Sequence, residues 1–181
     1  ALDKALREGE PLAVGQKLGR YVLKEYLGKG GFAEVWRAVD PGPGCVVALK
    51  VLHRAHHGDP ERVRRFFLGA TTMRELAEEF PAGIVKVLSD HEEHDERLFY
   101  VMEFVAGGDL DAARRDGRLD ADRAWQAMLQ VGETLRHIHE RNKIHRDIKP
   151  RNVLLGESGP KLTDFDLVRD TETRDENCRS I

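Results

Sequence analysis

The sequence predicts an α+β fold, with a β-rich first part and a mainly helical second part. Residues 20–104 contain several short apolar stretches with the period of β-strands and one long helical stretch. After the glycine-containing break AGGDL, the longest periodic stretch has the spacing of an amphipathic helix. We therefore expect two lobes that meet near residues 104–108, with a ligand site between them.

The first part is expected to contain five strands and a helix. Two strands surround a glycine-rich turn within residues 20–40, and the turn PGPG separates them from the strand-like run CVVALKVL. Two more strands are predicted at residues 83–90 and 97–105, joined by the polar stretch HEEHDE. The helix is predicted at residues 60–79, because a proline suits its first position and apolar residues recur at helical spacing.

The second part is expected to contain one long helix and two short strands. The helix is predicted at residues 121–142. Its apolar face is expected to consist of Trp125, Met128, Leu129, Leu135 and Ile138. The short strands, at residues 153–155 and 161–165, flank the turn GESGP.

Composition excludes several classes of protein. The 181 residues carry a net charge of −3, whereas nucleic-acid-binding domains usually have a basic excess. No apolar run approaches the roughly 18 residues of a membrane span, and the N-terminus is too charged for a signal peptide. The two cysteines, Cys45 and Cys178, lack the spacing of a metal site. The reducing cytoplasm is the expected compartment.

The stretch LGKGGFAEV, residues 27–35, is the first candidate site. It partly matches the pattern G-x-G-x-x-G-x-V, with Gly28, Gly30 and Val35 in their places and Ala33 in place of the third glycine. Glycines let backbone N–H groups approach phosphate oxygens without an intervening Cβ. The alternative is an ordinary hairpin that happens to contain glycines.

Lys50 is the second candidate, because it stands inside the apolar run VVALKVL. A charged residue is costly in such a strand unless it binds an anion. Its place after the glycine-rich turn favours a phosphate ligand, as in the pattern V-A-I-K. The alternative is a lysine that reaches solvent from the edge of a sheet.

The stretch IHRDIKPRNVLL, residues 144–155, places charged residues between aliphatic ones. It matches the pattern H-R-D-x-x-x-x-N at His145, Arg146, Asp147 and Asn152. In such a loop the aspartate accepts a proton from the attacking hydroxyl and the asparagine binds Mg²⁺. Downstream, Asp164 opens DFD, which is close to the Mg²⁺-binding motif D-F-G. The four motifs occur in order and together indicate phosphoryl transfer.

These motifs resemble those of the protein kinase superfamily, and most closely the bacterial Ser/Thr kinases of eukaryotic type. Lys149, two residues after the catalytic-loop aspartate, is similar to the Ser/Thr pattern. The resemblance implies a kinase-like fold with a polar lead-in at residues 1–19, a nucleotide-binding, β-rich N-lobe with one main helix at 20–104 and the first part of a mainly helical C-lobe at 105–181. It also implies transfer of the γ-phosphoryl group of ATP, with Mg²⁺, to Ser or Thr hydroxyls of a protein substrate.

The resemblance assigns roles to single residues. Asp147 would be the base, Lys149 would contact the γ-phosphate, and Lys50 would hold the α- and β-phosphates. Asn152 and Asp164 would hold Mg²⁺. The expected ATP contacts come from the glycine-rich turn, the walls of the adenine site, the gatekeeper and the hinge: Leu27, Gly28, Lys29, Gly30, Gly31, Phe32, Ala33, Val35, Ala48, Lys50, Met102, Glu103, Val105 and Leu154.

The resemblance extends to regulation. Arg146 would pair with a phosphorylated activation segment, modified by the protein itself or by an activating kinase. The candidate phosphorylation sites are Thr171, Thr173 and Ser180.

Two departures from the family pattern lie near the expected phosphate and metal sites. Gly69 stands where the family has the helix glutamate that pairs with the strand lysine, and Asp166 replaces the glycine of D-F-G. Because of Gly69, Lys50 is expected either to lack its usual partner or to use another acid, such as Asp164. Asp166 is expected to restrict the backbone and to add negative charge near the metal site, which would weaken Mg²⁺ binding, or else to point to solvent.

The chain stops where the activation segment would be under way, and we expect a fragment of a longer kinase. The departures leave a pseudokinase-like module, which binds nucleotide or a partner without efficient catalysis, as the alternative. A small-molecule kinase of related fold is a third interpretation, against which Lys149 argues.

Overall fold

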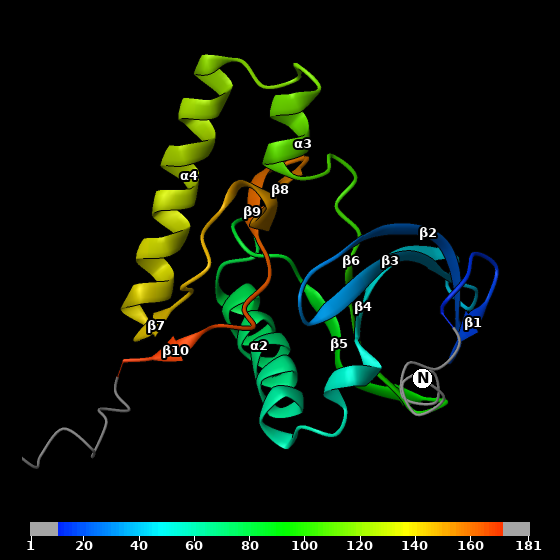
Figure 1. Cartoon of the computed structure of the whole chain (residues 1–181). Coiled ribbons are helices and arrows are strands. Elements are labelled where there is room, and N and C mark those ends of the chain that lie inside the picture. The colour runs from blue at the N-terminus through cyan, green and yellow to red at the C-terminus, as the bar shows by residue number, and fades with distance from the viewer. Residues whose placement is uncertain (1–10, 172–181) are drawn as a thin grey trace, which may run out of the picture.

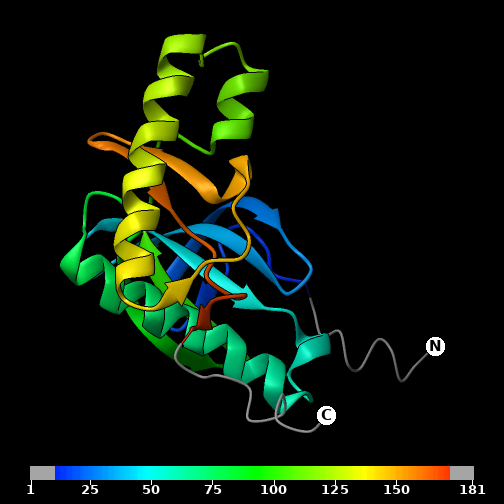
Figure 2. The same ribbon diagram turned by 90° about the vertical axis from the view of Figure 1, so that its left-hand side faces the viewer.

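The computed structural model describes residues 11–171 of the chain (Figure 1). A six-stranded antiparallel sheet forms the first part, in the order β1-β2-β3-β4-β6-β5. Its strands are β1 (Lys17–Leu18), β2 (Tyr21–Lys29), β3 (Ala33–Asp40), β4 (Cys45–Leu52), β5 (Val87–His94) and β6 (Arg97–Glu103). Helix α2 (Pro60–Glu79) packs beside this sheet, as both ribbon views show (Figures 1 and 2).

The described residues of the second part form two helices and two pairs of short strands. The helices are α3 (Leu110–Arg115) and α4 (Ala121–Glu140). The strands are β7 (Lys143–Ile144), β8 (Val153–Gly156), β9 (Gly159–Leu162) and β10 (Arg169–Asp170). Two 3₁₀ turns, η1 (Arg54–His56) and η2 (Pro150–Asn152), complete the described chain. Strand β8 pairs with β9 as a hairpin. Strand β7 pairs with β10, and this pairing brings together the two ends of residues 145–168.

Strand alternation divides the core into two clusters. Along β6, Phe99 and Val101 face one cluster, while Tyr100 and Met102 face the other, because successive strand residues point to opposite faces. The larger cluster joins the sheet and α2 to the second part through residues such as Ile138. The two parts of the chain therefore share one hydrophobic core at the place where the candidate site lies.

Helix α2 begins where the sequence predicts. Pro60 occupies its first turn, and the side chain of Asp59 accepts hydrogen bonds from the backbone N–H groups of Glu61 and Arg62. Such an N-cap satisfies donors that have no partner within the helix. The helix thus starts at a defined residue, which sets the position of Gly69 further along.

Two expectations about the elements are wrong. The strand predicted at residues 83–90 lies at 87–94, and its turn is formed by Asp95 and Glu96 in the left-handed region, with φ of 47° and 57°. Neither residue is glycine or asparagine, so the usual turn signal is missing. Because β5 is the last strand of the sheet, its polar residues can face solvent.

The apolar face of α4 also differs from the expectation. Its buried residues are Ala127, Val131, Thr134 and Ile138, whereas Trp125 is 67% exposed. Met128 and Leu129 are exposed as well. Ile138 is buried and Leu135 packs partly buried against the larger core cluster, so these two residues of the expected face are confirmed. In the part of the chain that the structure describes, no helix is long and apolar enough to cross a membrane.

Candidate active site

The glycine-rich turn connects β2 to β3. Leu27, Gly28 and Lys29 end β2, residues 30–32 form the turn, and the backbone N–H of Gly30 donates to the carbonyl of Ala33 at 2.8 Å. Ala33 is only 2% exposed and belongs to the larger core cluster. The methyl group in the third glycine position therefore points into the core.

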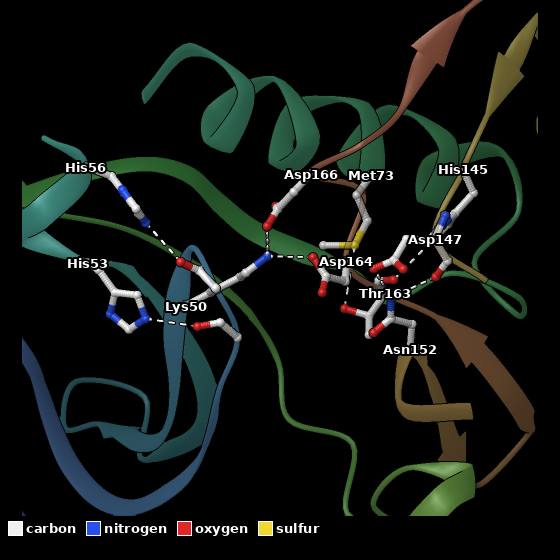
Figure 3. Close-up of polar contacts among 12 residues, drawn as sticks. Lys50, His53, His56, Met73, His145, Asp147, Asn152, Thr163, Asp164 and Asp166 are labelled. Atoms are coloured by element: carbon white, nitrogen blue, oxygen red, sulfur yellow. Dashed lines mark hydrogen bonds and ion pairs between the residues drawn. The ribbon is translucent and has the colours of Figure 1, made fainter. Parts of the chain in front are cut away.

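Two histidines hold this turn from outside. His53 Nε2 lies 3.1 Å from the carbonyl oxygen of Gly30, and His56 Nε2 lies 2.9 Å from that of Gly31 (Figure 3). The backbone N–H of His53 also donates to the carbonyl of Phe32 at 2.9 Å. All three carbonyls of the turn are thus bonded to the connection between β4 and α2. Among the described residues, no group of three or more His, Cys, Asp or Glu side chains could hold a metal ion.

Lys50 lies on β4, which has strand neighbours on both sides, so it is not an edge lysine. It is 7% exposed, and its Nζ lies near the rings of Phe66 and Tyr100. Nζ donates to Asp164 Oδ1 at 2.8 Å and to Asp166 Oδ2 at 2.6 Å (Figure 3). The buried ammonium therefore has two carboxylate partners, both from the segment after β9.

The ionisation of this group of three follows from burial and charge. Burial disfavours the ammonium, yet the carboxylates of Asp166 and Asp164 hold the pKa of Lys50 well above its usual value. Burial also acts to raise the pKa of Asp164, but the Lys50 ammonium outweighs it and holds that pKa below its usual value. Burial raises the pKa of Asp166 to about 6, although Lys50 acts in the opposite direction.

The catalytic loop is organised around Asp147. Lys149 Nζ donates to Asp147 Oδ2 at 2.6 Å, and Asn152 Nδ2 donates to the same oxygen at 3.0 Å and to the Asp147 carbonyl at 2.8 Å. The backbone N–H of Thr163 donates to the carbonyl of Asn152 at 3.0 Å. This last bond places Asp164 next to the catalytic loop.

His145 anchors the loop in the core. Its Nε2 donates to the carbonyl of Thr163 at 3.0 Å, its Nδ1 accepts from the backbone N–H of Asp147, and its ring packs against Phe165. Burial lowers the pKa of His145, so the ring is neutral near pH 7. Arg146 and Asp164 have φ of 64° and 69°, a conformation that costs energy for residues with a Cβ and is concentrated at functional sites.

Apolar residues line the space beside these charges. Ala48 and Met102 face each other across β4 and β6, and both are buried. Val35, Val105 and Leu154 are partly buried against the same cluster. The Glu103 side chain accepts from Lys161 Nζ at 2.6 Å and from the Lys86 backbone N–H at 2.8 Å. These bonds fix the segment that the sequence predicts as the hinge.

Comparison with known protein families agrees with the arrangement of these residues. Residues 21–180 match the family model described as "Protein kinase domain". The chain belongs to the protein kinase family. Among curated proteins it is similar to the serine/threonine-protein kinase PknA of Mycobacterium tuberculosis (strain ATCC 25618 / H37Rv), with 36% identity over 154 residues, covering 83% of this chain and 36% of that protein.

Further relatives point the same way. The DNA damage-responsive serine/threonine-protein kinase RqkA of Deinococcus radiodurans is 38% identical over 163 residues, which is 87% of this chain and 24% of RqkA. A crystal structure of the Mycobacterium tuberculosis PknI kinase domain, solved as a point mutant, superposes with a TM-score of 0.68 and 31% identity, covering 87% of this chain and 64% of that one. The predicted kinase-like α+β fold and the resemblance to bacterial Ser/Thr kinases are confirmed.

In this member of the protein kinase family, Gly69 lies directly against the DFD segment. A Cβ at position 69 would stand 2.9 Å from the carbonyl oxygen of Phe165 and 3.1 Å from the backbone nitrogen of Asp166. Sequence reasoning identified the missing glutamate but did not identify Asp166 as a contact of Lys50. The roles of His53 and His56 were also missed, and their only signal was their position directly after a strand that ends near the glycine-rich turn.

Proposed function

We propose that the protein is a Ser/Thr protein kinase that transfers the γ-phosphoryl group of ATP to a protein hydroxyl. One observation carries the proposal: Lys50, Asp147, Asn152 and Asp164, which come from separate elements, lie in one connected site (Figure 3). The names of the relatives PknA and RqkA support the same activity. Lys149, bonded to Asp147, supports a Ser or Thr acceptor.

The donor atoms fit a hard divalent cation such as Mg²⁺. Asn152 uses its amide nitrogen for both bonds to Asp147, so its amide oxygen is the atom that remains for a cation. The Asp164 carboxylate is ionised, because Lys50 holds its pKa low. Carboxylate and amide oxygens are the ligands that Mg²⁺ prefers. When bound, Mg²⁺ would neutralise charge on the phosphates.

Each residue of the site then has a separate role in the transfer. Asp147 orients the acceptor hydroxyl and takes its proton as the new O–P bond forms and the bond between the γ-phosphorus and the bridging oxygen of ADP breaks. Lys50 holds the α- and β-phosphates, and Lys149 contacts the γ-phosphate. The backbone N–H groups of the glycine-rich turn cover the phosphates, while Ala48, Leu154 and their neighbours enclose the adenine. Positioning and charge account for most of the rate.

Several arginines favour regulation by phosphorylation. A pocket of about 160 Å³ is lined by four arginines and two acids, namely Arg64, Arg65, Arg146, Arg169, Glu61 and Asp166. Arg64 and Arg65 donate to Glu61, which a phosphate would have to displace. Arginine forks suit phosphate oxygens. We infer that a phosphorylated residue of the segment after β10 binds here, through self-phosphorylation or an activating kinase. Thr171 is a candidate whose hydroxyl now donates to the Asn142 carbonyl, while Thr173 and Ser180 lie outside the described residues.

The pseudokinase alternative has little support, because Lys50 has carboxylate partners despite Gly69. ATP and Mg²⁺ are both plentiful in the cytoplasm, where we expect the protein to act. The chain spans 36% of the PknA sequence, so the substrate, the acceptor residues and the activity of the whole protein belong to this proposal.

A melting experiment and a transfer assay test the proposed function. ATP with Mg²⁺ at about 100 times Kd should stabilise the fold by roughly 2.7 kcal/mol. The protein should also transfer phosphate from radiolabelled ATP to Ser or Thr in a general protein substrate. A melting temperature that ATP raises equally without Mg²⁺, together with no transfer, would contradict the proposal and favour the pseudokinase.

A further inference from the structure

Lys50 is a buried cation that needs a carboxylate to hold it, and α2 does not provide one. In protein kinases the strand lysine is paired with a glutamate of the following helix. Here that helix position is Gly69, which has no side chain and whose Cα faces the backbone of Phe165 and Asp166. A side chain at this position would meet backbone atoms at 2.9 to 3.1 Å, so the helix lies closer to the DFD segment than a glutamate permits.

Asp166, in the segment after β9, provides a carboxylate for Lys50. Its Oδ2 lies 2.6 Å from Lys50 Nζ, and the exposed fractions of the two side chains are 12% and 8%. Its other oxygen, Oδ1, is buried and has no hydrogen-bond partner among the described residues. An unpaired buried acceptor is costly, so the ion pair with Lys50 is the printed contact that offsets the burial of this carboxylate. The burial and the short contact therefore point to a role that involves Lys50.

We propose that Asp166 replaces the missing α2 glutamate as the positioning residue for Lys50, and that Gly69 provides the space for this exchange. The inference rests on the proposed kinase function. It explains both departures from the family pattern by one cause, since each departure is unfavourable without the other. A chain with Gly69 but without Asp166 would leave Asp164 as the one carboxylate partner of Lys50 among the contacts described.

With this arrangement, Lys50, Asp164 and Asp166 can each have a different role. An ammonium has three donors, and Asp164 and Asp166 take one each. The third donor remains for a phosphate oxygen. Because Asp166 holds Lys50, Asp164 can bind a cation without releasing the lysine. Asp164 is also the more exposed of the two acids, with 33% of its side chain accessible.

A double-mutant cycle tests whether Asp166 acts through Lys50. The variants Asp166→Asn, Lys50→Met and the double variant are compared by thermal melting without nucleotide. Asp166→Asn should lower the melting temperature in the natural background, because Lys50 loses a partner. In the Lys50→Met background the same change should have little effect or a stabilising one, because Asp166 has no cation to lose there. The shift in the natural background should be about 3 °C or more.

Asp90→Asn is the matched control. Asp90 is a partly buried acid beside α2 that is bonded to Thr71 and Arg74, and it does not touch Lys50. Its effect on the melting temperature should be the same in both backgrounds. Equal shifts for Asp166→Asn in both backgrounds would overturn the inference.

Kinetics provide the second readout. Asp166→Asn should lower kcat/KM for ATP by about tenfold to a hundredfold, because Lys50 is no longer held in place. Unchanged or increased transfer would overturn the positioning role, and an increase would mean that Asp166 withholds Lys50 from the nucleotide. The melting cycle requires no ATP, so failure of the proposed kinase function and failure of this inference can be told apart.

Discussion

The catalytic loop and the Lys50 site solve the same problem, the placement of charge, in different ways. In the catalytic loop, Asp147 is bonded to residues two and five positions away in the chain. Lys50 is instead bonded to residues 114 and 116 positions away. The catalytic loop keeps its family pattern, and the Lys50 site does not. The contacts of Asp147 are encoded within one short motif. The partner of Lys50 comes from a distant part of the chain, so one partner can be exchanged for another.

The exchange is possible because three elements meet at Lys50. Strand β4 carries the lysine, α2 carries Gly69, and the segment after β9 carries both aspartates. A carboxylate from any element that reaches Nζ satisfies the ammonium. By contrast, the Asp147 carboxylate is bonded to Lys149 and Asn152 of its own loop. The comparison leads to three further predictions.

Asp147→Asn is expected to have the largest effect. It removes the proposed base but keeps an oxygen for Lys149 and Asn152, so the loop should remain folded. Transfer should fall by about 10²- to 10⁴-fold, while the Kd for ATP should be nearly unchanged. The rate and the Kd are measured by radiolabel transfer and by titration with a fluorescent ATP analogue. Asp116→Asn, an exposed acid at the end of α3, is the control. Normal transfer by the Asp147 variant would show that the assigned base is wrong.

The second prediction compares two glycines within helices of equal length. Gly69→Ala should destabilise the fold by about 1–3 kcal/mol, because its Cβ would push α2 away from the backbone of Phe165. Gly132→Ala in α4 meets nothing within 4 Å and should stabilise the fold by about 0.5–1 kcal/mol, through helix propensity. Urea unfolding of both variants measures the difference.

The outcome for Gly69→Ala bears directly on the comparison. A stabilising effect like that of Gly132→Ala would mean that α2 does not need to lie close to the DFD segment. The variant should also transfer phosphate more slowly, because movement of α2 disturbs the Asp166 contact. Slower transfer with unchanged stability would still link position 69 to Lys50.

The smallest expected effect concerns the glycine-rich turn. Replacing both His53 and His56 by Ala removes two bonds to the turn, each contributing about 0.5–1.5 kcal/mol. The KM for ATP should rise by about threefold to thirtyfold, with a smaller change in kcat, because the turn becomes less ordered. His94→Ala, on the exposed end of β5, is the control. An unchanged KM would show that the histidine contacts do not position the turn.

Much of the fold followed from local pattern. The strand with Lys50, the helix with Pro60 at its start and the hairpin around the glycine-rich turn lie where periodicity and turn chemistry place them. The short elements β1, β7, β10 and α3 were not expected, because two to six residues carry too weak a periodic signal. The shift of β5 and the buried face of α4 depended on neighbours, which a single stretch of sequence does not identify.

The candidate site shows the same division. The residues expected to perform chemistry could be named from motifs, because phosphoryl transfer requires particular side chains at short, regular spacing. The acid that holds Lys50 could not be identified, since the motifs left open whether Lys50 has no partner or uses another acid such as Asp164. The close approach of Gly69 to the backbone of Phe165 leaves no room for an acidic side chain at position 69. Asp166 instead places its Oδ2 2.6 Å from Lys50 Nζ. Packing made this choice, because a buried ammonium accepts whichever carboxylate the surrounding elements bring within reach.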